Sequence, residues 1–116
     1  MGDNKGELSD YRTVYKIAIE FGFRALGSQV SKVVANYLSR KYGIILADTF
    51  SKPDLLEEAL EGTLGGGGRL IERRIVKSIY IQLSSPINDS DIRLRTKQDF
   101  SRYIMESQKT FQETHG

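Results

Sequence analysis

Cysteine is absent from this 116-residue chain, and histidine occurs only once, as His115. The lack of cysteine excludes disulfides, thiolate metal sites, iron–sulfur clusters and thiol nucleophiles. A single penultimate histidine also excludes serine-type catalytic triads and histidine-rich metal centres. The sequence therefore predicts a protein that is not an enzyme, with no catalytic residue, no metal site and no cofactor.

Long hydrophobic runs are lacking as well. No stretch approaches the ~20 apolar residues that a membrane-spanning helix needs, and the N-terminal residues do not show the charged-then-apolar pattern of a signal peptide. The formal net charge is only +2, whereas a dedicated nucleic-acid-binding protein is usually more basic. We therefore expect a cytoplasmic protein with no membrane partner.

Apolar residues recur at helical spacing along most of the chain. The first predicted helix starts at Ser9 or Asp10, and Gly22 within it suggests a close approach to another helix. The second helix is expected to begin with Ser28 as its N-cap and to end at Gly43, which suits a left-handed C-terminal position.

Three further segments complete the predicted helices. One begins with Ser51 as N-cap and Pro53 in its first turn. The next runs over 69–83, although its end at 79–81 is also good strand sequence. The last helix is expected over 97–111, with a thin apolar seam that packs along one line or serves a partner.

The fold class that follows is all-α, a compact bundle of four to five helices. At most one short β element is expected, near 92–96, where apolar and polar residues alternate. The predicted organisation is a flexible segment 1–9, a single helical domain over 10–111 and a flexible segment 112–116. The core is predicted to contain ten residues: Ile17, Phe21, Val30, Val34, Leu38, Leu56, Leu60, Ile71, Ile75 and Ile79.

Aromatic residues divide into two predicted groups. We expect Tyr37 and Tyr80 to place their rings in the core with the hydroxyl groups at its edge. Tyr11, Tyr15 and Tyr103 are the candidates for exposed contacts.

Four consecutive glycines, 65–68, separate an acidic helix from a basic one. Glycines lose much backbone freedom when they are fixed in a helix, so the run predicts a break in the helical structure. The run lacks the lysine and the hydroxyl residue of a phosphate-binding Walker loop. Two interpretations remain: a tight corner between helices, or an anion site formed by the bare amides of Gly67 and Gly68 beside Arg69.

Charges of opposite sign flank this glycine run. Arg69, Arg73 and Lys77 lie four residues apart and share one helix face, with Arg74 beside them. The preceding helix carries Asp54, Glu57, Glu58 and Glu61, of which the three glutamates are expected on a solvated polar face. Intramolecular charge matching across the glycine corner is the leading interpretation, and contact with nucleic-acid phosphates is the alternative.

A second group of basic residues follows near the C-terminal third. Arg93, Arg95 and Lys97 point the same way if this segment is extended, and they fan out if it is helical. They are candidate phosphate contacts, but the preceding Asp89 and Asp91 bring the region close to neutrality.

Several short motifs together resemble the archaeal output-domain family NitrOD5. They are the corner at 23–28, the helix end at 37–44, the leucine-rich acidic helix at 52–60, and the glycine turn into a helix at 64–72. The resemblance spans about residues 15–83 and implies a small helical module attached to archaeal signalling or regulatory proteins, with no catalytic residues. The chain departs from the family pattern at Ser28, where an acidic residue is common, and at Thr63-Leu64, where Phe is usual.

The function expected from the sequence is therefore a non-enzymatic regulatory or protein-interaction module of archaeal type. A protein partner or self-association is expected, and self-association would use the last helix. The alternative is a DNA-binding protein that uses the basic stripe on the helix after the glycine run.

Overall fold

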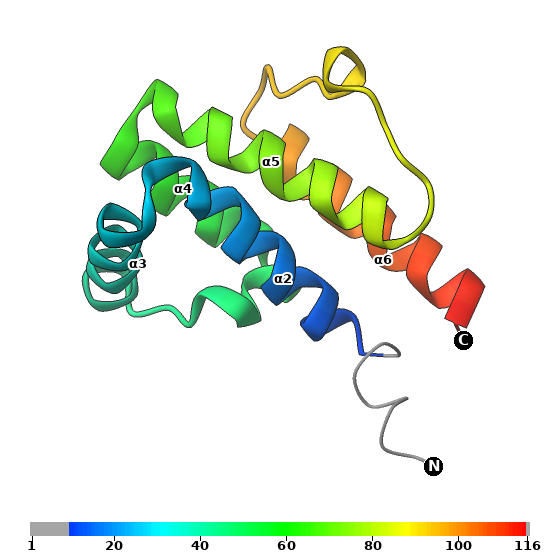
Figure 1. Cartoon of the computed structure of the whole chain (residues 1–116), viewed down its shortest axis with the longest axis horizontal. Helices are drawn as coiled ribbons and strands as arrows, with labels where there is room; N and C mark the ends of the chain where they lie inside the picture. The colour runs from blue at the N-terminus through cyan, green and yellow to red at the C-terminus, as the bar shows by residue number, and fades with distance from the viewer. Residues whose placement is uncertain (1–9, 116) are drawn as a thin grey trace.

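The computed structural model describes residues 10–115, and within them the chain is all-α with no strand (Figure 1). The predicted all-α bundle is thus confirmed. The α-helices are α2 (Tyr11–Phe23), α3 (Ser28–Tyr42), α4 (Pro53–Leu64), α5 (Gly66–Gln82) and α6 (Asp99–His115), joined in part by the 3-10 helices η1 (Arg24–Leu26), η2 (Leu46–Ser51) and η3 (Asp89–Asp91). No helix of this described part is both long and apolar enough to cross a membrane.

Helices α2 and α5 pack side by side at the centre of the bundle (Figure 1). Gly22 of α2 makes this close packing possible, as predicted. A Cβ atom at Gly22 would lie 2.8 Å from Ile75 Cγ1, a distance that ordinary Cβ atoms essentially never show, and a tight 3.1 Å from the Ile71 carbonyl oxygen. Ile71, Ile75 and Ile79 are fully buried at this contact, in agreement with the predicted core.

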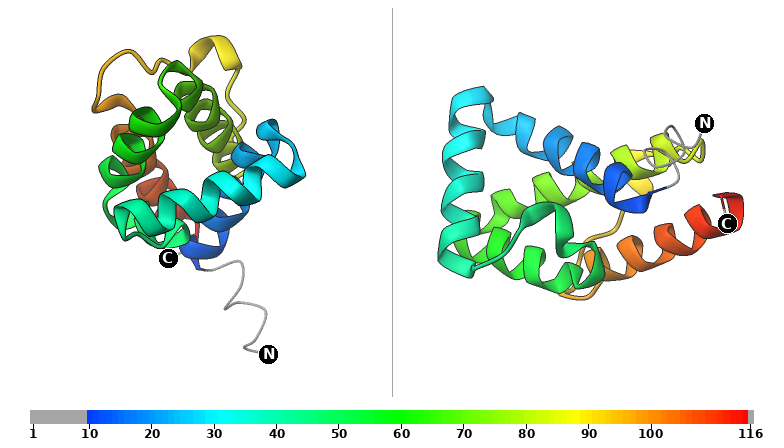
Figure 2. Two further views of the ribbon diagram at one scale, coloured as in Figure 1. Left: turned by 90° about the vertical axis from the view of Figure 1, so that its left-hand side faces the viewer. Right: turned by 90° about the horizontal axis from the view of Figure 1, so that it is seen from below.

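Helix α3 lies across one end of the bundle rather than alongside the other helices (Figure 2). Only Leu38 of this helix is buried, and α3 makes its main contacts with η1 and α4. It ends at Tyr42, and the Gly43 that caps it has a φ of 62°, the left-handed conformation predicted for that glycine.

The C-terminal helix α6 packs against α4 and α5 along a narrow seam. Phe100, Ile104, Ser107 and Phe111 are buried and recur at helical spacing, which confirms the thin seam predicted for this helix. The helix begins two residues later than predicted and continues to His115, beyond the predicted end at 111. The segment 1–9 and Gly116, predicted to be flexible, lie outside the described residues.

Several predicted core positions are exposed instead. Ile17 and Val30 are 44% and 51% exposed, and Tyr37 is 43% exposed. Conversely, Tyr11 and Tyr15, predicted to be available for contacts, are buried and donate hydrogen bonds to Ser107 Oγ (2.6 Å) and Thr49 Oγ1 (2.8 Å). Phe21 and Val34 are half-buried at the edge of the core.

Helix boundaries also differ from the predictions. Gly27, rather than Ser28, is the N-cap of α3, and Lys52, rather than Ser51, is the N-cap of α4, because the chain before Pro53 forms η2. Residues 79–81 are helical and not a strand. Pro53 occupies the first turn of α4, as predicted, where its missing N–H has no intrahelical partner to lose.

Candidate functional site: a buried carboxylate cluster around Arg69

The glycine run forms the corner between α4 and α5, but only Gly65 interrupts the helical structure. Gly65 has a φ of +56°, and α5 begins at Gly66, so the predicted start at Arg69 is wrong by one turn. Gly66, Gly67 and Gly68 therefore form the first turn of α5. At position 68 there is no room for a side chain, because a Cβ atom there would lie 3.0 Å from the Leu60 carbonyl oxygen.

Arg69 follows directly and is held by four oxygen atoms. Its Nη1 lies 3.1 Å from Glu57 Oε2, 3.3 Å from Glu61 Oε2 and 3.0 Å from Glu72 Oε1. Its Nη2 donates a hydrogen bond to the Thr96 carbonyl oxygen at 3.1 Å. The charge matching predicted between the acidic and basic helices is therefore present, and it converges on one guanidinium group.

Burial distinguishes these carboxylates from ordinary surface pairs. The Glu57 side chain is only 5% exposed and that of Glu72 is fully buried, whereas the Glu61 side chain keeps 27% of its exposure. The prediction that Glu57 and Glu61 lie on a solvated face is thus wrong for Glu57, and only partly right for Glu61. One oxygen of Glu72, Oε2, is buried without a hydrogen-bond partner.

The pKa values follow from this crowding. Burial raises the pKa of Glu72 to about 8, and the nearby carboxylates of Glu61 and Glu57 act in the same direction. Burial, with the neighbouring Glu61, also raises the pKa of Glu57 to about 7. Arg69 opposes both shifts but does not cancel them. Near neutral pH the cluster therefore holds protons that free glutamates would have lost.

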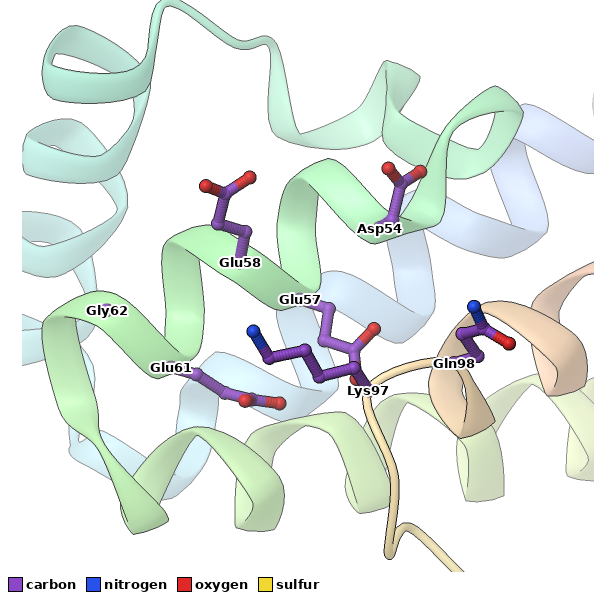
Figure 3. A pocket seen from close by; sticks show the side chains of 7 residues that line it. All are labelled: Asp54, Glu57, Glu58, Glu61, Gly62, Lys97 and Gln98. Atoms are coloured by element: carbon purple, nitrogen blue, oxygen red, sulfur yellow. The ribbon is translucent and has the colours of Figure 1, made fainter.

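A pocket of about 580 Å³ opens beside this cluster between α4 and the segment that leads into α6 (Figure 3). Its lining includes Glu57, Glu61 and Lys97. Glu57 and Glu61 turn their carboxylates toward α5, while Asp54 and Glu58 point the opposite way (Figure 3). The pocket gives solutes a path to Glu57 and Glu61, the two cluster residues that line it.

The other basic residues of the predicted stripe also make internal contacts. Arg73 donates hydrogen bonds to the carbonyl oxygens of Asp89 and Ile92, and Lys77 pairs with the Asp89 carboxylate at 3.2 Å. Arg74 lies over the Phe21 ring, 4.2 Å from its centroid, and donates two hydrogen bonds to the Phe21 carbonyl oxygen. These side chains hold the segment 89–92 and the end of α2 against α5.

The remaining predicted binding residues fall in two places. Gly67 and Gly68 lie in the first turn of α5, next to the carboxylates that surround Arg69, so the electrostatic surroundings there disfavour an anion. Arg93, Arg95 and Lys97 are exposed, and their side chains form no ion pair within residues 10–115. The stripe residues Arg69 and Arg73 contact the carbonyl oxygens of Thr96 and Ile92 in this same segment, so their own charges are engaged in internal contacts.

Glu72 was not among the predicted site residues, although the sequence contains a signal for it. It precedes Val76 and Ile79 by four and seven residues, which places it on the buried face of α5. Arg69 stands three residues before it, at the spacing of a helical ion pair. A charged residue on an apolar face with an oppositely charged residue one turn away indicates a buried ion pair.

A second surface of interest is the outer face of α3, defined by Val30, Val33 and Tyr37. These side chains are 51%, 68% and 43% exposed, and they recur at positions i, i+3 and i+7. Helix α3 carries three basic residues and no acidic one. The fold thus leaves an apolar stripe with basic neighbours uncovered on α3. This helix lies at one end of the bundle (Figure 2).

No protein-family model, curated protein or solved structure matches the chain.

Proposed function

We propose that this protein is a non-enzymatic protein-interaction module that self-associates through the outer face of α3. The observation that carries the proposal is the exposed stripe formed by Val30, Val33 and Tyr37 on a helix that buries only Leu38. Apolar residues repeated on one helix face and left uncovered favour a helix–helix contact with another chain.

A second copy is the occupant that the stripe fits best. In an antiparallel pairing about a two-fold axis, Val33 lies near the centre and Val30 of one copy faces Tyr37 of the other. Antiparallel helices also place their dipoles in a favourable orientation. One helix face is small for an interface, so we expect a weak, reversible dimer.

This choice changes the surface expected from the sequence. Self-association was expected through the last helix, but the apolar seam of α6 is buried against α4 and α5. The resemblance of the motifs over 15–83 to the NitrOD5 family supports a regulatory role in an archaeal signalling protein. A cytoplasmic setting agrees with the absence of cysteine.

The test compares two exposed apolar residues. The mass in solution is measured by sedimentation equilibrium over a wide range of protein concentrations for the wild type, Val33→Asp and Ile81→Asp. Ile81 is 53% exposed on α5, away from the α3 stripe, and serves as the matched control. We expect the wild type and Ile81→Asp to dimerise as concentration rises and Val33→Asp to remain monomeric. A wild type that stays monomeric throughout would refute the proposal.

DNA binding is the alternative function. The observation in its favour is that Arg93, Arg95 and Lys97 are exposed and form no ion pair within the described residues. A titration with duplex DNA at low and moderate salt tests it. Binding should weaken as salt rises and should be lost when the three residues are replaced by glutamine. Affinity that does not depend on salt would argue against phosphate contacts.

A further inference from the structure

We propose that Glu57, Glu61 and Glu72 form a binding site for a hard divalent cation, of the calcium or manganese class, in which the metal takes the place of the Arg69 guanidinium group. The sequence alone predicted no metal site, because the three residues come from two helices and only the fold brings them together. The proposal is independent of self-association through α3.

The geometry of the three carboxylates suits such an ion. One oxygen from each residue lies within 4.8 Å of the others, and all three surround the position now held by Arg69 Nη1 at 3.0–3.3 Å. Calcium binds oxygen at about 2.3–2.6 Å, so each carboxylate needs to move inward by less than about 1 Å. Carboxylate oxygens are the ligands that calcium and manganese prefer.

A fourth oxygen lies at the edge of the same group. The Thr96 carbonyl accepts a hydrogen bond from Arg69 Nη2, so it becomes available when the guanidinium leaves. Backbone carbonyls are common ligands of calcium. The oxygen atoms that now hold a cationic side chain thus form a mixed carboxylate and carbonyl set.

The second, independent observation is the unsatisfied oxygen of Glu72. The side chain of this residue is fully buried, and its Oε2 has no hydrogen-bond partner. When the three carboxylates are ionised, one guanidinium leaves the cluster short of positive charge, and a buried carboxylate oxygen without a donor is costly. A divalent ion supplies both the missing charge and the missing partner.

Access to the cluster and an exit for Arg69 are both present. Glu57 and Glu61 line the pocket of about 580 Å³, which reaches solvent (Figure 3). The Arg69 side chain is itself 25% exposed, so its long stem can carry the guanidinium outward. Arg69 is then a competitor for the metal rather than a ligand, and this role distinguishes the proposal from a purely structural ion-pair cluster.

The experiment measures Ca²⁺ binding by isothermal titration calorimetry and Mn²⁺ binding by electron paramagnetic resonance, at constant ionic strength. Four proteins are compared: the wild type, Glu61→Gln, Arg69→Gln and the control Glu58→Gln. Glu58 lines the same pocket but lies outside the carboxylate cluster. Circular dichroism establishes that each variant is folded.

We expect one ion per chain in the wild type, with a dissociation constant on the order of 10⁻⁴–10⁻³ M because Arg69 must be displaced. Glu61→Gln should weaken binding at least about tenfold, Arg69→Gln should strengthen it, and Glu58→Gln should leave it unchanged. If Arg69→Gln unfolds without metal, added Ca²⁺ should restore its structure.

Three results would overturn the proposal. The first is the absence of saturable binding of both ions to the wild type. The second is binding that Glu61→Gln and Glu58→Gln weaken equally, which would indicate diffuse attraction to an acidic surface. The third is a folded Arg69→Gln protein that binds no more tightly than the wild type.

Discussion

Raising the pH from 5.5 to 8.5 should destabilise this protein, and the buried Glu72 should cause most of the loss. The pKa of Glu72 is about 8 in the folded protein, against an ordinary value of 4.5. The folded state therefore keeps a proton that the unfolded chain releases. The stability that this proton contributes is fully present below pH 4.5 and is lost as the pH rises through 8.

The magnitude follows from proton linkage. One extra proton in the folded state changes the free energy of unfolding by about 1.4 kcal/mol per pH unit. Between pH 5.5 and 8 this amounts to roughly 3 kcal/mol, which corresponds to a fall in Tm on the order of 10 °C for a domain of this size. Glu57, whose pKa is about 7, acts in the same direction at the lower end of this range.

Glu72→Gln provides the decisive comparison, because glutamine has the same shape but does not titrate. Tm is measured by circular dichroism at half-unit pH steps, with Glu58→Gln, an exposed residue of α4, as the control. The wild type and Glu58→Gln should lose stability steeply over pH 5.5–8.5, and Glu72→Gln should show a shallower slope. A wild-type Tm that is constant or rises over this range would refute the reasoning.

Asp99 should not disturb this measurement. Its carboxylate accepts hydrogen bonds from the backbone N–H groups of Thr96 and Arg95, and these bonds lower its pKa to about 2. Its contribution to stability is present above its ordinary pKa and is lost only as the pH falls toward 2. The two effects therefore occupy separate pH ranges.

Three substitutions test the packing of the fold, each by urea unfolding. Gly68→Ala should cost about 1–3 kcal/mol, because its Cβ atom would meet the Leu60 backbone. Gly66→Ala should instead stabilise the protein by up to about 1 kcal/mol, since no atom lies within 4 Å of its Cβ position and its backbone is already helical; equal effects at the two glycines would contradict the corner geometry. Tyr15→Phe should cost about 1 kcal/mol through loss of the buried hydrogen bond to Thr49, and an unchanged midpoint would show that this bond contributes nothing.

The helical architecture was predictable because the apolar spacing is strong where helices are covered on one face. Leu56 and Leu60 of α4, and Ile71, Ile75 and Ile79 of α5, were predicted to be buried and are fully buried. Left-handed Gly43 and close-packed Gly22 were also predicted, since each glycine stands where a side chain would be strained or would clash.

The exposed positions of α2 and α3 were not predictable in the same way. Periodicity identifies an apolar face but not how much of that face the rest of the chain covers. On α3 the apolar residues extend over a wide arc, and the bundle covers only the side that carries Leu38 and Val34. Val30 and Val33 lie on the uncovered side, and only tertiary packing decides where that boundary falls.

The carboxylate cluster shows how a corner and a charged site depend on each other. The sequence indicated that the glycine run brings an acidic helix against a basic one, but the depth of this contact depends on Gly68, which lets α5 approach the Leu60 backbone. The close approach buries Glu57 and Glu72 beside Arg69. A corner with a side chain at position 68 would hold the helices farther apart and leave the same residues as an ordinary surface pair. The raised pKa values of Glu57 and Glu72 therefore depend on the close approach of Gly68 to the Leu60 backbone. The proposed cation site depends on the same approach.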